Sequence, residues 1–388
     1  MIITVGTGNG VDSGIAFAIK QQNPDYLCFI VSDDSRKTFD AVLSKIGKME
    51  QDVKVFPSNE VNDVEFLYRR YSAYFGEIIQ SGYAPHEIVA DYTSGTKSMS
   101  AALVSAAIAQ EIGILSYVYG DRDTQGRVIS NSERLSPLSP TAIFTEQKIK
   151  TFKTLFNQLQ FESALVIFQG DKLHHAYKTQ ITFLQQLAHG YAEWDKFNFE
   201  GASEKLNQID ANEIPDKALK KLLLSHRQWL HKIKINPELT TEKAIDLFCN
   251  AQRRFQESRY DDSVARLYRV IEMIGQIEFM HVFSCTTDKV PLDIIPQTLR
   301  TEFESKADNK QMLKIGLFDV FQILKETNNE KSNIFEANIK NIKKILSIRN
   351  ESILAHGVTA VKKSSFETFS ELVNLFLPNI APIEFPKL

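Results

Sequence analysis

The sequence predicts an α/β N-terminal domain built on a parallel sheet, followed by an all-α C-terminal domain. Three observations lead to this fold class. Short β-rich runs alternate with amphipathic helical patterns up to about residue 130, both patterns break at residues 135–140, and helical patterns dominate the rest of the chain. Alternation of the first kind is typical of a parallel sheet with helices on both faces.

Five strands of the N-terminal domain are predicted from short apolar runs bounded by polar or turn-forming residues. They cover residues 2–5, 26–31, 53–56, 88–91 and 114–119. Between them, amphipathic spacing predicts helices at residues 11–22, 36–47, 62–81 and 97–112. The segment 120–126, rich in Gly and Asp, predicts a hairpin into a last strand at residues 127–130.

The segment Leu135-Ser136-Pro137-Leu138-Ser139-Pro140 fits neither periodicity and indicates a domain boundary. With 388 residues, the chain is also longer than one core usually supports. We therefore expect an α/β domain at residues 1–138, a helical linker or packing region at 139–240, and a helical domain at 241–388. Residues 145–240 carry no chemical motif, so only helical packing is expected of them.

The composition indicates a soluble, cytoplasmic protein. The net charge of −3 argues against a general nucleic-acid coat protein, although a local basic cleft is compatible with it. No apolar run approaches the roughly 20 residues that span a membrane, and the N-terminus lacks the basic region of a signal peptide. Cys28, Cys249 and Cys285 have no spacing typical of a metal site or disulfide, so we expect reduced thiols.

The most informative stretch is Asp91-Tyr92-Thr93-Ser94-Gly95-Thr96-Lys97-Ser98-Met99. It lies between a predicted strand and a predicted helix, where free N–H groups and the positive end of the helix dipole attract anions. Hydroxyls, a glycine and a lysine at this place predict an anion-binding loop. The alternative is an ordinary strand–loop–helix turn, but capping a helix needs one hydroxyl and no lysine.

Two other loops follow predicted strands, Gly6-Thr7-Gly8-Asn9-Gly10 and Ser32-Asp33-Asp34-Ser35. Ligands of parallel sheets bind at the carboxyl ends of the strands. We therefore expect the three loops to form one ligand site. Its candidate residues are Gly6, Thr7, Gly8, Asn9, Ser32, Asp33, Asp91, Thr93, Ser94, Gly95, Thr96 and Lys97.

Common nucleotide motifs do not fit these loops. The dinucleotide fingerprint requires a third glycine where Val11 stands. Thr96 occupies the place of the glycine that precedes the lysine of a P-loop, and the upstream glycine is also missing. A nicotinamide enzyme and an NTPase are therefore disfavoured.

The second informative segment is Arg349-Asn350-Glu351-Ser352-Ile353-Leu354-Ala355-His356-Gly357. An apolar stripe at helical spacing predicts one helix that carries both Arg349 and His356 and ends at Gly357. At about 100° per residue, both side chains lie within some 60° of the centre of the stripe. The stripe consists of Phe335, Ile339, Ile342, Leu346 and Ile353.

Burying a guanidinium and an imidazole without partners is costly, so this placement needs an explanation. On spacing alone, Arg349 would be a buried arginine paired to a carboxylate and His356 a satisfied core histidine. In a helix the two side chains would lie about 10 Å apart. Two copies of the helix that face each other across a two-fold axis could then assemble one compact site.

These segments resemble those of a known family. Asp91, Thr93, Gly95, Thr96, Lys97 and Met99 match the strand-end motif Asp-x-Thr-Gly-Gly-Thr-Lys-x-Met of the CARF domain, a Rossmann-like sensor of CRISPR-associated proteins. Ser94 replaces the first glycine of that motif, which adds a Cβ and a hydroxyl. Arg349 and His356 are similar to the Arg-x4–6-His signature of HEPN ribonucleases, in which a polar residue such as Asn350 often follows the arginine.

The helical segment 260–272 also resembles CARF–HEPN proteins of the Csm6/Csx1 group, especially the Cas02710-like subfamily. Within it, Arg269 and Glu272 are three residues apart. We expect them to form a surface ion pair, with a supporting role in the active site as the alternative.

The resemblance implies an endoribonuclease of type III CRISPR antiviral defence that a cyclic oligoadenylate activates. It implies a homodimer that cleaves single-stranded RNA without a metal and leaves a 2′,3′-cyclic phosphate. His356 would act as general acid or base, Arg349 would stabilise charge on the phosphorus, and Asn350 would orient the phosphate or His356. Thr93, Ser94 and Lys97 would be placed to cleave the activator slowly.

No metal or other cofactor is expected, because His174-His175 lacks a third ligand at a useful spacing. The alternative function is a non-catalytic nucleotide sensor that recruits a partner through its helical domain. The ring size of the activator and the base preference do not follow from the sequence.

Overall fold

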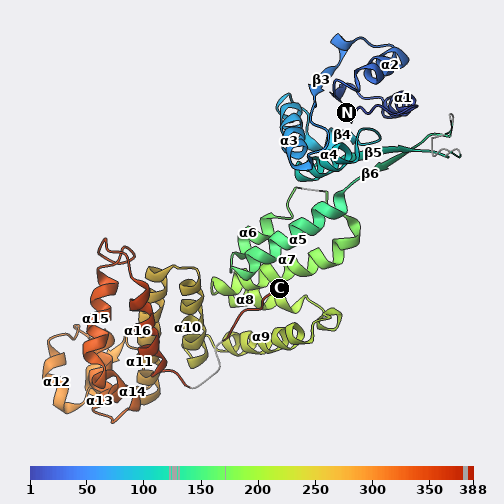
Figure 1. The fold of residues 1–388 in the computed structure, drawn as a ribbon. Helices are drawn as coiled ribbons and strands as arrows, with labels where there is room; N and C mark the ends of the chain where they lie inside the picture. Colours follow the sequence, from blue (N-terminus) through green and yellow to red (C-terminus); the bar gives the residue numbers. More distant parts are fainter. Residues whose placement is uncertain (122–123, 125–128, 130–131, 171, 379–382) are drawn as a thin grey trace. The chain divides into compact units, whose positions relative to one another are not determined.

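The computed structural model describes the chain from Met1 to Leu388, apart from residues 122–123, 125–128, 130–131, 171 and 379–382 (Figure 1). The described residues form two compact units. The first contains Met1–Lys150 and Gly170–Thr179, and the second contains Thr151–Gln169 and Gln180–Leu388. Within these described residues, no helix is both long and apolar enough to cross a membrane. The division into 1–138, 139–240 and 241–388 stays a prediction.

The first unit is built on a six-stranded sheet with the order β3-β2-β1-β4-β5-β6. The first five strands run parallel, and β6 is antiparallel to β5. All five predicted strands are confirmed to within two residues. The strands are β1 (Ile2–Thr4), β2 (Cys28–Val31), β3 (Lys54–Pro57), β4 (Val89–Asp91), β5 (Ile114–Tyr119) and β6 (Arg134–Leu138).

Helices cover both faces of this sheet, as predicted: α1 (Val11–Gln22), α2 (Arg36–Ile46), α3 (Val64–Gln80) and α4 (Lys97–Ala109) (Figure 1). Successive strand residues point to opposite faces. Ile3 therefore packs in a core with α1 and α2, whereas Ile2 packs in a core with α3 and α4. Burial of both faces explains why the strands are continuous apolar runs rather than alternating ones.

The sixth strand occupies residues for which the sequence pattern predicted no strand. β6 pairs with β5 from Leu115↔Leu138 to Tyr119↔Arg134. Pro137 is tolerated there because β6 is an edge strand, where a missing N–H need not interrupt the ladder. The predicted hairpin at 120–126 and strand at 127–130 lie largely outside the described residues.

Helices make up most of the second unit, which confirms the all-α prediction apart from a short ribbon of β7 (Val290–Pro291) and β8 (Met312–Leu313). Helix α11 lies at the centre of its main core and packs against α10, α13, α15 and α16. The helices after the sheet are α5 (Thr141–Asn157), α6 (Phe161–Val166), α7 (Lys178–Asp195), α8 (Phe199–Asn207), α9 (Lys217–Ile235), α10 (Thr241–Gln256), α11 (Tyr260–Phe283), α12 (Gln297–Glu304), α13 (Leu317–Lys325), α14 (Glu330–Ala337), α15 (Ile339–Asn350) and α16 (Lys363–Asn374).

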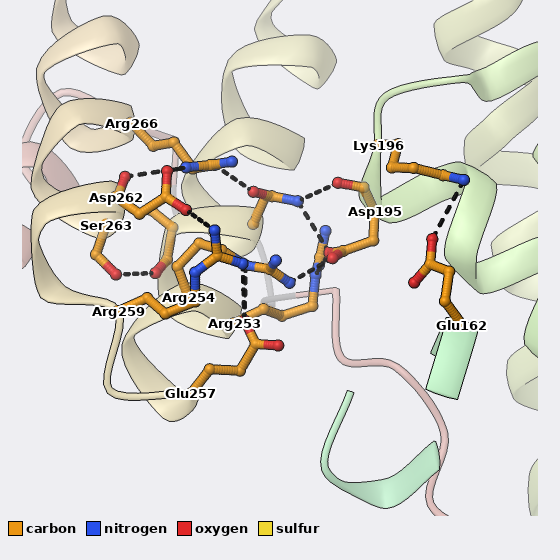
Figure 2. Close-up of polar contacts among 12 residues, drawn as sticks. Glu162, Asp195, Lys196, Arg253, Arg254, Glu257, Arg259, Asp262, Ser263 and Arg266 are labelled. Atoms are coloured by element: carbon orange, nitrogen blue, oxygen red, sulfur yellow. Dashed lines mark hydrogen bonds and ion pairs between the residues drawn. The ribbon is translucent and has the colours of Figure 1, made fainter. Parts of the chain in front are cut away.

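Asp195, the last residue of α7, is the centre of a buried charge network (Figure 2). Its Oδ1 accepts hydrogen bonds from Arg253 Nε at 2.8 Å and Asn250 Nδ2 at 3.0 Å, and its Oδ2 pairs with Arg254. Asn250 Oδ1 in turn accepts from Arg266 Nε at 2.6 Å. The Asp195 network, made of these five residues, thereby ties the end of α7 to α10 and α11.

The C-terminal segment packs against the same region. The Arg253 guanidinium lies 3.9 Å from the ring centroid of Phe385, and the Trp194 ring lies 5.2 Å from it. The Leu388 amide donates to Asn157 Oδ1 at 2.8 Å. These contacts hold the C-terminal residues against α5, α7 and α10, which lie far earlier in the sequence.

Candidate functional site

The strand order brings the three predicted ligand loops to one edge of the sheet. β1 lies between β2 and β4, so the loops at residues 6–10, 32–35 and 92–96 all follow the carboxyl ends of adjacent strands. The chain reverses its winding direction between β1 and β4, which is where open α/β sheets usually bind ligands. The predicted site residues are thus gathered at this edge, called the sensor edge below.

Five of the candidate residues at the sensor edge are exposed and available to a ligand. They are Thr7, Gly8, Asn9, Asp33 and Lys97. Lys97 is the first residue of α4, so its positive charge adds to that of the helix N-terminus. A phosphate is the type of group that this combination attracts.

Asp91 has a structural role. It is fully buried, and its Oδ1 accepts a hydrogen bond from the Thr93 amide at 3.0 Å. Burial raises the pKa of the Asp91 carboxyl above its usual range. Thr93 Oγ1 accepts from the Val118 amide at 2.9 Å, which joins the turn to β5. Asp91 therefore shapes the loop and does not face a ligand.

Ser32 and Thr96 are also engaged within the protein. The Ser32 amide donates to Ser35 Oγ at 2.9 Å, so the loop after β2 closes on itself. Thr96 caps α4 by accepting from the Met99 amide at 3.1 Å and donates its hydroxyl to Val61 O at 2.6 Å. The capping role was the alternative for this stretch, and it coexists with the exposed lysine.

The contact between Thr96 and Val61 brings a fourth loop, residues 58–63 after β3, to the sensor edge. This loop was missed in the sequence because its polar residues form no recognisable motif. The rule that ligands bind at strand ends applies to β3 as well and could have indicated it.

In the second unit, α15 ends at Asn350, so the prediction of one helix through Arg349 and His356 is wrong. The chain instead folds back over a turn, and the His356 amide donates to Asn350 O at 3.1 Å. A Cβ on Gly357 would lie 1.9 Å from Glu351 O. Gly357 therefore permits this close return and does not end a helix.

The apolar stripe is interrupted for the same reason. Phe335 and Ile342 are buried as predicted, but they lie on two helices, α14 and α15, that are separated at Asn338. Ile353 follows the end of α15 and is 63% exposed. The expected separation of about 10 Å along a helix axis does not apply to Arg349 and His356.

Arg349 lies on the packed side of α15, as predicted. Its Cζ is 5.2 Å from the ring centroid of Tyr268 on α11, a distance typical of a cation–π contact. Its Nη1 donates to Asn350 Oδ1 at 2.9 Å. Among the described residues, no carboxylate is paired with Arg349, so Arg349 itself is not a buried arginine of a structural ion pair.

Tyr268 packs against Arg349 and also interacts with Glu272. Burial, followed by interaction with the Glu272 carboxylate, raises the pKa of the Tyr268 hydroxyl. Glu272 also pairs with Arg269 at 3.2 Å, which confirms the predicted ion pair and places it beside Arg349. Tyr268 is not among the site residues that the sequence indicated.

The His356 side chain is exposed, and so is Asn350. Three apolar neighbours in the same turn are exposed as well: Ile353 by 63%, Leu354 by 57% and Val358 by 88%. His356 is therefore not a satisfied core histidine. The exposed His356 side chain lies in the same turn as these apolar side chains, and its backbone amide bonds to the residue that follows Arg349.

Among the described residues, no group of three His, Cys, Asp or Glu side chains is arranged to hold a metal ion. His174 and His175 stack with ring centroids 4.6 Å apart, and His174 Nδ1 accepts from the Ala176 amide. The metal-independent mechanism stays a prediction.

Comparison with known proteins identifies both parts of the helical region. The Csm6 HEPN domain family matches residues 235–378, and the Csm6 6H domain family matches residues 144–235. Together they cover more than half of the chain. The second match covers the stretch in which the sequence offered no motif.

The fold is also similar to a solved structure, Enterococcus italicus Csm6 bound to cyclic hexa-2′-fluoro-hexa-dAMP. The two chains share 13% identity with a TM-score of 0.59, over 97% of this chain and 92% of that one. No curated protein matches the sequence.

Proposed function

Because the chain belongs to the Csm6 family of CARF–HEPN proteins, we propose that it is a ribonuclease that a cyclic oligoadenylate switches on. The observation that carries this proposal is the return of the chain at the end of α15, which brings His356 back to the residue after Arg349. The RNA-cleaving site and the sensor edge then lie in different units and have different chemistry.

The residues around Arg349 suit a reaction in which a 2′-hydroxyl of the RNA attacks the adjacent phosphodiester. His356 would transfer the proton of that hydroxyl or of the leaving oxygen, since imidazole titrates near neutral pH. Arg349 would stabilise the charge that develops on the phosphorane oxygens, where its fork of donors fits two oxygens at once. Asn350 holds Arg349 through its side-chain oxygen and leaves the donors on the other side of the guanidinium for the phosphate. The product would be a 2′,3′-cyclic phosphate, formed without a metal.

A second copy of the chain would complete this site. Ile353, Leu354 and Val358 form an apolar surface directly beside His356, and exposed apolar side chains in a cluster favour association. Two copies related by a two-fold axis would bury this surface and bring two Arg349–His356 pairs together. The homodimer is supported by this apolar surface and by the exposure of His356 to solvent in a single copy of the chain.

At the sensor edge, Lys97 and the loops at residues 6–10 and 32–35 would bind the phosphates and riboses of the activator. E. italicus Csm6 binds a cyclic hexanucleotide analogue in its solved structure, which supports a ligand of this class here. Slow cleavage of the activator, the further activity suggested by the sequence, would rest on Thr93 and Lys97. Ser94 is less suited to it because its side chain is buried.

The proposal predicts that single-stranded RNA is degraded only when an activator is present. A fluorescent RNA would be incubated with the protein in EDTA, alone or with cyclic tetra-adenylate or cyclic hexa-adenylate, and the product ends would be analysed. We expect activation by one ring size and products with 2′,3′-cyclic phosphate ends. Loss of cleavage in EDTA would contradict the metal-free mechanism, and binding of a ring without any cleavage would favour the non-catalytic sensor that recruits a partner.

A further inference from the structure

Ser94 differs from its exposed neighbours at the sensor edge because it is turned into the protein and is only 6% exposed. Its Oγ donates to Thr4 O at the end of β1, and the Gly6 amide donates to that same Oγ at 3.2 Å. The Thr4 hydroxyl donates in return to Ser94 O. Three hydrogen bonds therefore connect Ser94 to Thr4, the last residue of β1, and to Gly6, the first residue of the loop after it.

The backbones of the two loops also touch. A Cβ on Gly6 would lie 2.6 Å from the amide nitrogen of Gly95, so only glycine permits this approach. Gly95 has a φ of +103°, which also favours glycine. The loop after β1 and the loop after β4 are thus in direct contact at Ser94 and at Gly95.

Thr4 is an internal residue. It is fully buried and pairs with Ile30 in the middle of the sheet, so no ligand at the surface can touch it. This separates two roles that Ser94 could have. A ligand contact would involve Ser94 alone, whereas a structural connection requires both Ser94 and Thr4.

We propose that Ser94 and Thr4 form a clasp that joins the two principal activator loops into one preorganised surface. Ser94 is then a positioning residue for the activator and not a contact residue. The clasp rests on the proposed function for its effect on affinity, but its existence in the free protein does not depend on any ligand. The clasp also gives a role to the Ser94 hydroxyl at the position where the CARF motif has its first glycine.

The physical reason is the entropy of the loops. A glycine at position 94 would leave the backbone freer and would offer no side chain to hold the neighbouring loop. Loops that are already fixed lose less freedom when a ligand binds, so affinity increases without any additional contact. Three hydrogen bonds that are shielded from water together favour one arrangement of these short loops.

The proposal is tested with Ser94→Ala, Thr4→Val and the double variant, each titrated with cyclic tetra-adenylate and cyclic hexa-adenylate by calorimetry. Thermal denaturation establishes that each variant is folded. Thr4→Val removes one of the three hydrogen bonds and should weaken binding by about threefold to tenfold, and Ser94→Ala, which removes the other two, should weaken it at least as much. The two losses should not add up: the double variant should bind about as well as the single variant that binds less tightly, because both substitutions open the same clasp. Thr4→Ser keeps the hydroxyl and should bind like the wild type, as should Ser44→Ala on the exposed side of α2.

A second measurement needs no ligand. Amide hydrogen exchange of the free protein should be faster at residues 6–8 and 93–96 in both single variants than in the wild type. If the wild type binds neither ring, the proposed function fails while the exchange experiment still decides whether the clasp exists. Weaker binding by Ser94→Ala with unchanged binding and exchange in Thr4→Val would overturn the proposal and make Ser94 a direct contact. Unchanged exchange in both variants would also overturn it.

Discussion

Replacing His356 with alanine is expected to lower activated RNA cleavage by about 100- to 10,000-fold. Histidine is the commonest general acid or base, and such catalysis typically contributes a factor of this size. The measurement is the single-turnover rate of RNA cleavage at saturating activator. Arg349→Ala should have a similar effect, and Arg349→Lys should recover little, because lysine lacks the planar fork of donors.

The matched control is His189→Ala, since His189 is an exposed histidine on α7, away from the turn after α15. It should cleave RNA like the wild type. Activator binding should be retained in His356→Ala because the sensor edge belongs to the other unit. Full RNA cleavage by His356→Ala would show that the site has been assigned to the wrong residues.

Replacing Asp195 with alanine is expected to lower the free energy of unfolding of the second unit by about 3–5 kcal/mol. The Asp195, Arg253 and Arg254 side chains are only 11%, 5% and 9% exposed, so removal of the carboxylate leaves the buried Arg253 guanidinium without its ion-pair partner and leaves Arg254 with Glu257 alone. Removing one partner of a buried ion pair is costly because the remaining charge stays desolvated. Urea unfolding followed by tryptophan fluorescence measures this effect, since both tryptophans lie in the second unit and Trp194 precedes Asp195 directly.

An exposed ion pair provides the control for Asp195. Lys363 and Glu367 pair on α16 of the same unit with side chains 63% and 54% exposed, so Glu367→Ala should change stability by less than about 0.5 kcal/mol. If Asp195→Ala unfolds at the same urea concentration as the wild type, the Asp195 network (Figure 2) does not stabilise the joint between α7 and α10.

The first unit could be predicted from the sequence because its signals are local. Each strand is a short apolar run with a helical pattern after it, and both features act over a few residues. The rule for ligands at strand ends then indicated the sensor edge. The β3 loop was not identified, since only the contact between Thr96 and Val61 reveals that it belongs to the same edge.

The end of α15 could not be predicted from local signals. The apolar spacing continues to Ile353, and Gly357 looks like a helix stop, yet the backbone turns after Asn350. The reason is tertiary: Ser352 is buried, and Val361 lies near enough to α11 for its amide to donate to Asp261 Oδ1 at 3.4 Å. Periodicity does not report such long-range contacts.

The surroundings of Arg349 were unpredictable for a similar reason. Tyr268 lies 81 positions earlier in the chain, and nothing in its own helix distinguishes it from the other buried residues of α11. The Asp195 network likewise joins residues more than 50 positions apart. Helices that pack through ordinary apolar faces carry no chemical motif, so residues 145–240 gave no signal.

The separation of sensing from cleavage is best tested by an activator titration of RNA cleavage with Lys97→Ala, with Lys20→Ala at the end of α1 as the matched control. Loss of the exposed ammonium at the start of α4 should shift the midpoint to a roughly tenfold to hundredfold higher activator concentration, the usual effect of losing a charged hydrogen bond. The cleavage rate at saturating activator should remain that of the wild type. An unchanged midpoint, or a lost cleavage rate with unchanged activator affinity, would contradict the assignment of this loop to activator sensing.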